Sequence, residues 1–453
     1  MIEKKSGPAG KKAVVIGASM AGLLAARVMA DHFEQVIMLE RDRFPEPGSN
    51  RKGVPQGKHT HVFLERGRQI METYFPGLTS ELTGKGAVWI NDASNNVSWF
   101  HSGDFHKQGQ SGISGIGVSR PTLETSVRLR VSALSNVMIM EKCRVLELIP
   151  ADSNQRISGI RFFNSGKDAE TTLMADLVVD ASGRGSRSPA WMEKLGYQPP
   201  EVEKIKIDMG YTTCHFHRKP DHIPGRDGIV FLATPPEKRL GVILAQDRDR
   251  WVVTIGGYLG DHAPTDYPGF LQAVRDLPSP EIYHVIKDEV PLEHPVPYKF
   301  TANQRHHYEK LPDFPEGYLV LGDALCSFNP IYGQGMTVAA MEAGALDSCL
   351  ENGLYGLAGR FFTKASKIID LAWDSAVGND LSYPEVKGSR TLMIRFLNWY
   401  IKKLHIAAHK DAAVSIAFLK VINMVAPPPS MMHPGIIWRI LKHNFVPTIG
   451  SKA

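Results

Sequence analysis

A short glycine-bearing segment near the start of the chain combines residue types that can hold a phosphate group. Gly17, Ser19 and Gly22 stand where an apolar run, residues 13–17, gives way to an Ala/Leu-rich run, residues 22–30. Gly17 permits a tight turn, Gly22 permits close packing of a helix on a strand, and the small Ser19 leaves room for a pyrophosphate. Backbone N–H groups at the start of the helix would attract the charge of the phosphates. The residues predicted to line this dinucleotide cradle are Gly17, Ser19, Met20, Ala21 and Gly22.

An acidic residue closes a second short apolar run, residues 36–39, and stands 18 positions after Gly22. The carboxylate of Glu40 can accept hydrogen bonds from a ribose 2′-hydroxyl and repels a 2′-phosphate, which favours FAD or NAD over NADP. Strand, helix, second strand and acid follow one another within residues 13–40, which indicates a βαβ unit rather than a strand–helix turn of another α/β fold. We assign the next residue, Arg41, to the same site.

A second candidate segment lies late in the chain, where an apolar run, residues 318–321, ends in Gly322 and Asp323. Asp323 can accept a hydrogen bond from a ribityl hydroxyl of a flavin. The stretch PIYGQGM, residues 330–336, then opens a helix whose N-terminus can stabilise negative charge on a reduced flavin. The residues predicted here are Pro330 for catalysis and, for cofactor binding, Gly322, Asp323, Gly333, Gln334, Gly335 and Met336.

This late segment resembles the second FAD fingerprint of single-component flavin-dependent monooxygenases with the p-hydroxybenzoate hydroxylase fold. Two further segments resemble motifs of that superfamily: VVDASGRGS, residues 178–186, resembles its DG motif, and SRPTLE, residues 119–124, contains an arginine that resembles a conserved one. The resemblance implies that Asp180 and Gly183 touch both FAD and the pyridine nucleotide, and that Arg120 leans on the FAD. The matching segments span about three quarters of the chain in the expected order.

By this resemblance the fold is α/β (α+β), with a Rossmann-like FAD-binding domain interrupted by an antiparallel β-sheet substrate domain and followed by a C-terminal helical region. The chain order agrees, because alternating β patterns are frequent in residues 205–290 and helical patterns dominate from Met336 onward. We expect the FAD-binding domain in three parts, residues 1–90, 119–200 and 299–350. The substrate domain is expected at residues 91–118 and 201–298, and the helical region at residues 351–453.

The resemblance implies an FAD-dependent monooxygenase that uses NADPH or NADH and O2. The substrate would be a hydrophobic small molecule of secondary metabolism, such as antibiotic biosynthesis, hydroxylated or epoxidised through a C4a-hydroperoxyflavin. Three segments, RKGVPQGKHTH, SRPTLE and SFNPIYGQGMTVAAMEA, are similar to those of bacterial FAD-dependent oxidoreductases related to polyether-type and squalene-type epoxidases. The flavin carries the oxygen chemistry, so the protein supplies position, dryness and charge.

Other functions are possible for a chain with these motifs. A reductase of the geranylgeranyl-reductase type would saturate isoprenoid double bonds with a flavin hydride. A flavin-dependent halogenase would carry a WxWxIP signature, which the sequence lacks. A non-enzymatic FAD-dependent redox sensor is the remaining alternative, and turnover of nicotinamide would distinguish it from an enzyme.

Two histidines, His59 and His61, stand in a Pro/Gly-rich loop, residues 43–61, that follows the first unit. We assign both as catalytic, because by the resemblance this loop faces the flavin and an imidazole can hydrogen-bond to its edge. A structural role, with one histidine capping the loop, competes with this assignment. No metal site is predicted, since a third ligand is not nearby. Arg51 and Lys58 flank the pair, and either could meet nucleotide phosphates or remain solvated; we assign Arg51 to cofactor binding.

Composition excludes several other classes of protein. The 453 residues are 43% hydrophobic and 22% charged, as in soluble globular enzymes of two or three domains. Four dispersed cysteines without a CxxC pair exclude a disulfide scaffold and a zinc module and favour a cytoplasmic location. The net charge is +5, but residues 387–453 alone contribute +9. This local excess does not indicate a nucleic-acid partner for the whole protein.

The basic region also carries apolar residues at helical spacing between Leu392 and Leu404, with Lys402 and Lys403 near the other face. The favoured interpretation is a helical lid packed on the other domains. A basic amphipathic helix, followed here by a segment containing Trp438, can instead make peripheral contact with a membrane. No apolar run reaches the length of about 18 residues that a transmembrane helix needs.

Overall fold

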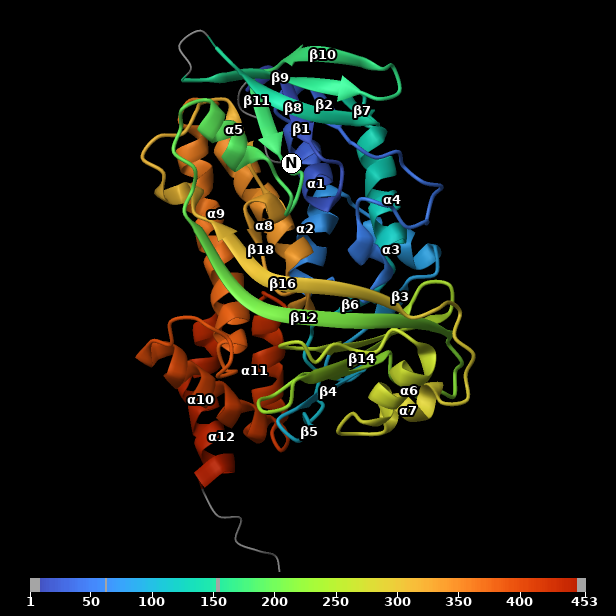
Figure 1. The fold of residues 1–453 in the computed structure, drawn as a ribbon. Helices are drawn as coiled ribbons and strands as arrows, with labels where there is room; N and C mark the ends of the chain where they lie inside the picture. The colour runs from blue at the N-terminus through green and yellow to red at the C-terminus, as the bar shows by residue number, and fades with distance from the viewer. Residues whose placement is uncertain (1–8, 62, 152–154, 446–453) are drawn as a thin grey trace, which may run out of the picture.

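A five-stranded parallel sheet organises the upper part of the molecule in the computed structural model, which describes residues 9–61, 63–151 and 155–445 (Figure 1). β11 and β17 are wholly buried and β1 is buried over its last four residues, which explains the short, continuous apolar sequences there. The strand order is β17-β11-β1-β2-β7, so segments far apart in the chain meet in one sheet. These strands are β1 (Gly10–Ile16), β2 (Phe33–Leu39), β7 (Val137–Met140), β11 (Leu177–Asp180) and β17 (Tyr318–Val320).

Helices cover this sheet, and a small antiparallel sheet lies beside it. Helix α1 (Met20–Met29) packs against α8 (Gly335–Leu350) and also contacts α4 (Arg120–Ser132). The remaining helices of this part are α2 (Glu65–Tyr74), α3 (Leu78–Gly84), α5 (Ser188–Lys194) and the long α9 (Leu357–Asp380). The small sheet has the order β10-β9-β8, from β8 (Cys143–Pro150), β9 (Ile157–Asn164) and β10 (Ala169–Met174).

An eight-stranded sheet forms the lower part, and its two longest strands, β12 and β16, run across the molecule between the two parts (Figure 1). Neighbouring strands are antiparallel except for the parallel pair of β13 and β4. Helices α6 (Tyr267–Arg275) and α7 (Glu281–Ile286) pack on it. In sheet order the strands are β18 (Cys326–Ser327), β16 (Val296–His306), β12 (Val202–His217), β15 (Arg250–Gly257), β14 (Arg239–Gln246), β13 (Gly228–Phe231), β4 (Val97–His101) and β5 (Asp104–Phe105). A separate pair joins β3 (Val88–Ile90) and β6 (Gly115–Gly117).

Three C-terminal helices, α10 (Leu392–Ala408), α11 (Ala412–Ile422) and α12 (Pro434–Phe445), form a layer beside the large sheet (Figure 1). Residues such as Tyr400, Leu404 and Phe418 enclose a small core that also includes Ile113. The helices thus cover other parts of the chain, as a lid would. None of the helices in the described residues is both long and apolar enough to cross a bilayer.

The α/β fold class is confirmed, but several local predictions differ from the structure. The sequence pattern of residues 137–148 predicts one strand, but the chain turns at Lys142, which has a positive φ of 59°, and passes from β7 in one sheet to β8 in another. The helices α6 and α7 and the β8–β10 sheet were not predicted. The expected boundary at residue 298 falls inside β16, which pairs with β12 along most of its length.

Candidate active site

The predicted dinucleotide cradle is a tight junction between β1, α1 and the end of β11. Gly17 has a positive φ of 98°, and a Cβ added there would lie 2.6 Å from the Ala181 carbonyl oxygen. A Cβ on Gly22 would lie only 2.0 Å from the Gly17 carbonyl oxygen. Within the described residues, α1 has neither a side-chain cap nor an acidic residue in its first turn. Its N–H groups, from Met20 to Gly22, are therefore available to an anion.

A buried network of two arginines and two glutamates lies behind this cradle. Arg51 Nη1 donates to Glu40 Oε2 at 2.9 Å, and Arg51 Nη2 lies 3.3 Å from Glu124 Oε1. Arg120 donates to Glu124 Oε2 at 3.0 Å and to the Ser19 hydroxyl at 2.9 Å. Glu40 also accepts the Ala18 N–H at 3.0 Å. The predicted residues thus lie together, and the opposite charges compensate one another.

Glu124 is a site residue that the sequence analysis missed. It lies one helical turn after Arg120 in α4, so the i,i+4 spacing of opposite charges was an available signal. Arg41, by contrast, is exposed beside Glu40 and outside this network.

The late glycine segment, which begins at Gly322, packs against the same cradle. Gly322 has a positive φ of 70°, and a Cβ there would lie 2.7 Å from the Cβ of Ala21 in α1. The Gly322 N–H donates to Glu342 Oε2 at 2.7 Å. Burial, with a smaller effect of Asp323, raises the pKa of Glu342 to about 8. Glu342 therefore holds a proton at neutral pH while it anchors this turn.

The Asp323 side chain is exposed to solvent but lies deep in a recess, surrounded by other parts of the protein. This enclosure raises the pKa of Asp323, while the guanidinium groups of Arg120 and Arg184 oppose the rise. A carboxylate placed in this way, between cationic donors, can accept a hydrogen bond from a ligand hydroxyl.

The loop that begins α8 is anchored by a buried carboxylate on another helix. Asp380, at the end of α9, accepts hydrogen bonds from Asn303 Nδ2 at 2.7 Å, Asn329 Nδ2 at 3.1 Å and the Tyr332 hydroxyl at 3.2 Å. Burial raises the pKa of Asp380 to about 6. These bonds fix the 3₁₀ turn at Pro330–Tyr332, after which Gly333, with a positive φ of 65°, leads into α8. Like α1, α8 lacks a side-chain cap within the described chain.

The DG-like loop borders open space through its glycines. A Cβ added at Gly183 or Gly185 would meet no described atom within 4 Å, and the same holds at Gly335. Asp180 is completely buried and accepts hydrogen bonds from the Ser182 N–H at 2.9 Å and from the Ser186 hydroxyl at 2.6 Å. We therefore expect Asp180 to shape this loop rather than to touch the cofactor.

These features fit an FAD. Two uncapped helix N-termini offer N–H donors, and three glycines leave space for a flat group. Two polar side-chain atoms here, Arg51 Nε and Gln334 Oε1, are buried without a hydrogen-bond partner in the part of the chain that the structure describes. Unpaired buried donors and acceptors are costly, so they indicate groups that a ligand would satisfy. Met336, in the first turn of α8, is half-buried next to this region.

Of the two histidines assigned as catalytic, His59 lies against strands β12 and β16 of the large sheet. The Nδ1 atom of His59 lies 2.9 Å from the Thr213 hydroxyl, which lies 2.6 Å from that of Thr254, and Thr254 lies 2.7 Å from Thr60. Burial lowers the pKa of His59 to about 4, and burial with Arg120 lowers that of His61 to about 3, so both are neutral at pH 7. His61 is hydrogen-bonded to the His59 carbonyl oxygen at 2.9 Å.

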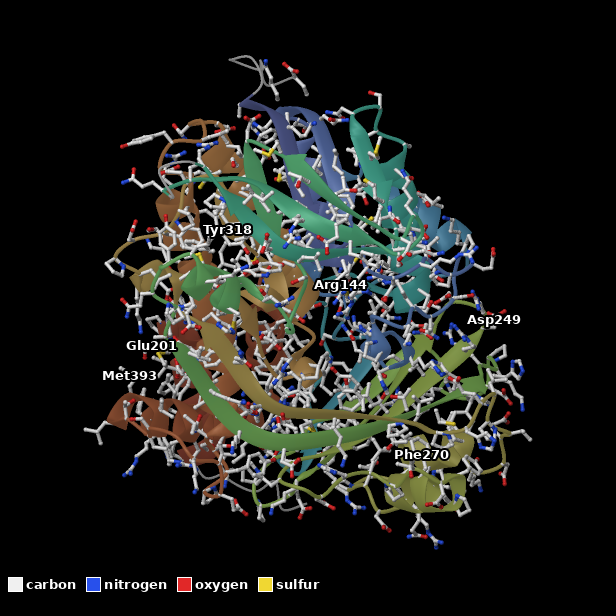
Figure 2. All side chains as sticks on the ribbon, turned by 45° about the horizontal axis from the view of Figure 1, so that its top comes forward. Arg144, Glu201, Asp249, Phe270, Tyr318 and Met393 are labelled. Atoms are coloured by element: carbon white, nitrogen blue, oxygen red, sulfur yellow. The ribbon has the colours of Figure 1, made fainter. Side chains whose placement is uncertain are left out.

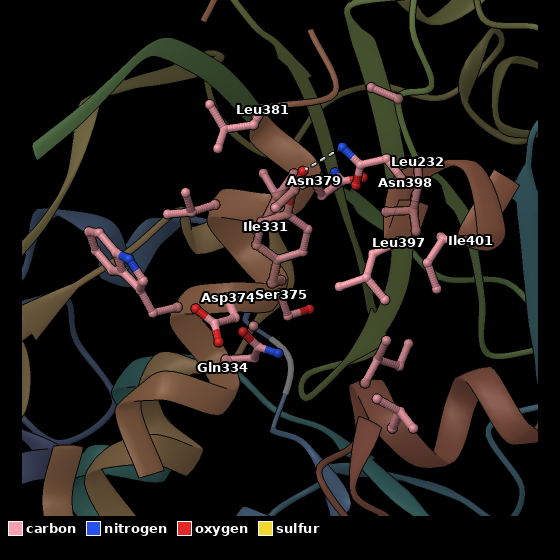
Figure 3. A pocket seen from close by; sticks show the side chains of 18 of the residues that line it. Leu232, Ile331, Gln334, Asp374, Ser375, Asn379, Leu381, Leu397, Asn398 and Ile401 are labelled. Carbon is pink, nitrogen blue, oxygen red and sulfur yellow. Dashed lines mark hydrogen bonds between the residues drawn. The ribbon is translucent and has the colours of Figure 1, made fainter. Parts of the chain in front are cut away.

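A cavity of about 670 Å³ lies between the large sheet and the C-terminal helices (Figure 3). Leu232 and Val242 line it from the sheet, and Leu397 and Ile401 line it from α10. Figure 3 shows three of its polar side chains, Gln334, Asp374 and Ser375, close together, and two others, Asn379 and Asn398, in another part of the lining. Pro330 to Gln334 and both Thr60 and Thr254 border this cavity, whereas His59 and His61 do not. The hydroxyl chain therefore connects His59 with the cavity.

Solved structures of other proteins share this fold. The chain superposes on the flavin-dependent brominase Bmp2 with a TM-score of 0.66 and 14% identity, over 95% of this chain and 97% of that one. It superposes on PqsL, a probable FAD-dependent monooxygenase from Pseudomonas aeruginosa, with a TM-score of 0.61 and 17% identity, over 82% and 97%. At these identities the likeness shows the fold, which this chain shares with those flavin-dependent proteins.

Sequence similarity identifies the nearer family. The chain is 33% identical to Protein Rv3254 of Mycobacterium tuberculosis over 347 residues, 75% of this chain and 73% of that protein, and belongs to the same family. It is also 24% identical to digeranylgeranylglycerophospholipid reductase 1 of Methanococcoides burtonii, over 73% of this chain and 72% of that one. No protein-family model matches the chain.

Substitution of Gly22 by alanine is expected to prevent stable flavin binding. The added methyl group would clash with the Gly17 backbone, and overpacking of this kind costs about 1–3 kcal/mol. The flavin absorbance that remains with the protein after gel filtration measures the effect. Gly359→Ala in α9 is the matched control, because a Cβ there meets no described atom within 4 Å. Equal flavin content in both variants would contradict the prediction.

Proposed function

We propose that the protein is an FAD-dependent monooxygenase that uses NADPH or NADH and O2 to hydroxylate or epoxidise a hydrophobic small molecule. The observation that carries this proposal is the apolar cavity, which reaches the Pro330–Gln334 loop at the N-terminus of α8. A cavity of this volume holds a drug-sized or larger apolar molecule. The substrate thus lies against the position where the flavin edge is expected.

The chain's own residues would bind and orient the substrate and exclude water from the site. When bound, FAD supplies the redox and oxygen chemistry. The start of α8 offers unpaired N–H groups that stabilise negative charge there, and Asp380 keeps the loop before it in place. Leucine, isoleucine and valine side chains exclude water from the cavity. We propose a cytoplasmic location and a role in secondary metabolism; the four cysteines are buried free thiols, which suits a reducing compartment.

His59 is proposed to exchange a proton with the cavity through Thr213 and Thr254. Thr254→Val should therefore lower product formation by roughly tenfold or more and flatten its pH profile, because acid–base groups contribute about 10²–10⁴-fold to rates. Thr212→Val is the matched control, since Thr212 donates to the Ala263 carbonyl at 3.2 Å outside this chain of hydroxyls. Initial rates of product formation between pH 4 and 8, a range that includes the lowered pKa of His59, provide the measurement. An unchanged profile in Thr254→Val would show that His59 acts only as a structural residue.

A second candidate function is reduction of isoprenoid double bonds. The observation that favours it is the similarity to digeranylgeranylglycerophospholipid reductases over about three quarters of the chain. The same apolar cavity would accept a prenyl chain. In that reaction the substrate gains two hydrogen atoms and no oxygen.

Isotope labelling separates the two functions. The purified flavoprotein is incubated with NADPH or NADH and a panel of lipophilic alkenes, phenols and prenyl lipids, under isotopically labelled dioxygen and, in parallel, without oxygen. Incorporation of one labelled oxygen atom supports the monooxygenase. A product heavier by two hydrogens that also forms without oxygen would refute the monooxygenase and support the reductase. No oxidation of nicotinamide under any condition would refute both.

A further inference from the structure

The C-terminal helices expose a cluster of large apolar side chains to solvent. Seven of the sixteen strongly exposed large hydrophobic side chains in the described residues lie on α10 and α12. On α10, Leu392, Phe396 and Trp399 follow one helical face, and Trp399 is 48% exposed. The full set is Leu392, Met393, Phe396, Trp399, Trp438, Leu441 and Phe445, which we call the aromatic face. Of the apolar stripe predicted for α10, Tyr400 and Leu404 are buried in the small core of the helical layer, whereas Leu392, Met393 and Phe396 are exposed.

The two helices contribute to one continuous surface. Lys403 Nζ on α10 lies 5.0 Å from the centre of the Phe445 ring on α12, and Asn444 Nδ2 donates to the Lys403 carbonyl at 2.9 Å. On α10, the rings of Phe396 and Trp399 are 5.9 Å apart. The aromatic face therefore spans two helices that contact each other.

The segment that carries the aromatic face is strongly basic. Residues 387–445 contain nine lysines and arginines but one acidic residue, Asp411. That carboxylate is already paired, with Arg439 at 2.7 Å and His443 at 3.5 Å. A second copy of the chain would bring like charges together at this face, whereas an anionic surface complements them.

We propose that the aromatic face docks onto the surface of an anionic lipid bilayer. Tryptophan, phenylalanine and leucine side chains would enter the interface, and lysines such as Lys402 and Lys442 would contact the headgroups. The helices lie in the interface and do not cross it, in agreement with their length.

The docked orientation also places the entrance of the cavity at the lipid. Met393 lines the cavity and is 63% exposed, and Figure 2 shows it at the outer edge of the molecule. Ile394 and Leu397 continue from it into the cavity. A lipophilic substrate could then pass from the bilayer into the site; this last step rests on the proposed function, while docking itself does not.

Vesicle sedimentation of the flavin-loaded protein tests docking. We expect at least tenfold tighter binding to vesicles of phosphatidylcholine with phosphatidylglycerol than to phosphatidylcholine alone, and weaker binding at high salt. The double variant Trp399→Ser/Trp438→Ser should lose most of the binding. Tyr355→Ser, which removes an aromatic side chain that is 89% exposed outside α10 and α12, should retain it.

Three results would overturn the proposal: no binding to anionic vesicles, equal loss of binding in the Tyr355 control, or self-association of the lipid-free protein that the double variant abolishes. The last result would assign the aromatic face to a second copy of the chain. Flavin content and nicotinamide oxidation are measured in every variant. Since neither Trp399 nor Trp438 is among the residues that line the cavity, a failure of docking is distinguishable from a failure of the proposed function.

Discussion

Replacement of Arg51 by methionine is expected to lower the free energy of unfolding by about 3–5 kcal/mol, the cost of breaking a buried ion pair by removing one partner. The Arg51 side chain is only 7% exposed, and Glu40 and Glu124 are each 6% exposed. Without Arg51, Glu40 keeps its backbone N–H donors but loses its counter-charge. Methionine retains much of the arginine's apolar length, so the loss reflects the charge rather than a cavity.

Urea unfolding followed by circular dichroism, with excess FAD present, measures this effect. Arg43→Met is the control, because Arg43 is exposed in the same loop and should change stability by less than about 0.5 kcal/mol. A second substitution, Glu40→Gln, should restore part of the stability of Arg51→Met by removing the unpaired charge. If Arg51→Met unfolds like Arg43→Met, the network does not stabilise the fold.

Acidification should release the C-terminal helices from the large sheet before the rest of the protein unfolds. Three histidines meet at this junction: the His101 and His405 rings stack with centroids 3.5 Å apart, and His405 Nδ1 lies 3.1 Å from His106 Nε2. A fourth histidine, His409, donates from Nε2 to the His101 carbonyl oxygen at 2.8 Å. Histidine side chains this close together repel one another when they are protonated, so the junction is stable only while they are largely uncharged.

The sign of the pH dependence follows from their pKa values. Burial, together with the other histidines, lowers the pKa of His101 to about 4 and that of His106 to about 3, and lowers that of His405 well below its usual value. The unfolded chain takes up these protons near pH 6.5, so stability is complete above that pH and falls as the pH drops toward 4. One unit of pKa difference corresponds to about 1.4 kcal/mol, so the junction loses on the order of a few kcal/mol.

Hydrogen exchange of α10 and α12 between pH 7 and 5, corrected for the intrinsic pH dependence of exchange, measures this release. His405→Leu should make the protection of these helices less dependent on pH, because it removes the central proton acceptor. His294→Gln is the control, since His294 is exposed far from the junction in sequence. Uniform loss of protection across the whole chain would instead assign the acid effect to other groups, such as His59 and His61.

The sequence allowed prediction of those parts of the site in which consecutive residues carry the signal. The turn from Gly17 to Gly22 and the segment from Gly322 to Met336 each contain strand, turn and helix signals within one short stretch. Their contacts with FAD remain predictions.

The anchors of these segments were not predictable in the same way. Asp380 meets Asn303 and Asn329 only after β16 and α9 have packed, and no periodic pattern marks such a meeting. Likewise, the apolar period of α10 predicts an amphipathic helix but does not show how much of its apolar face neighbouring elements cover. Local pattern determines the type of an element, whereas its partners depend on the tertiary arrangement.

Asp380 has a consequence for communication within the molecule. The carboxylate closes α9, from which the chain continues to α10, and it also holds the Tyr332 hydroxyl beside the start of α8. One side chain is therefore shared by the helical layer and the loop at the expected flavin edge. A ligand that displaces the end of α9 alters the energy of that loop. By thermodynamic reciprocity, a ligand that rearranges the loop changes the affinity of the helical layer for its own partner by the same factor.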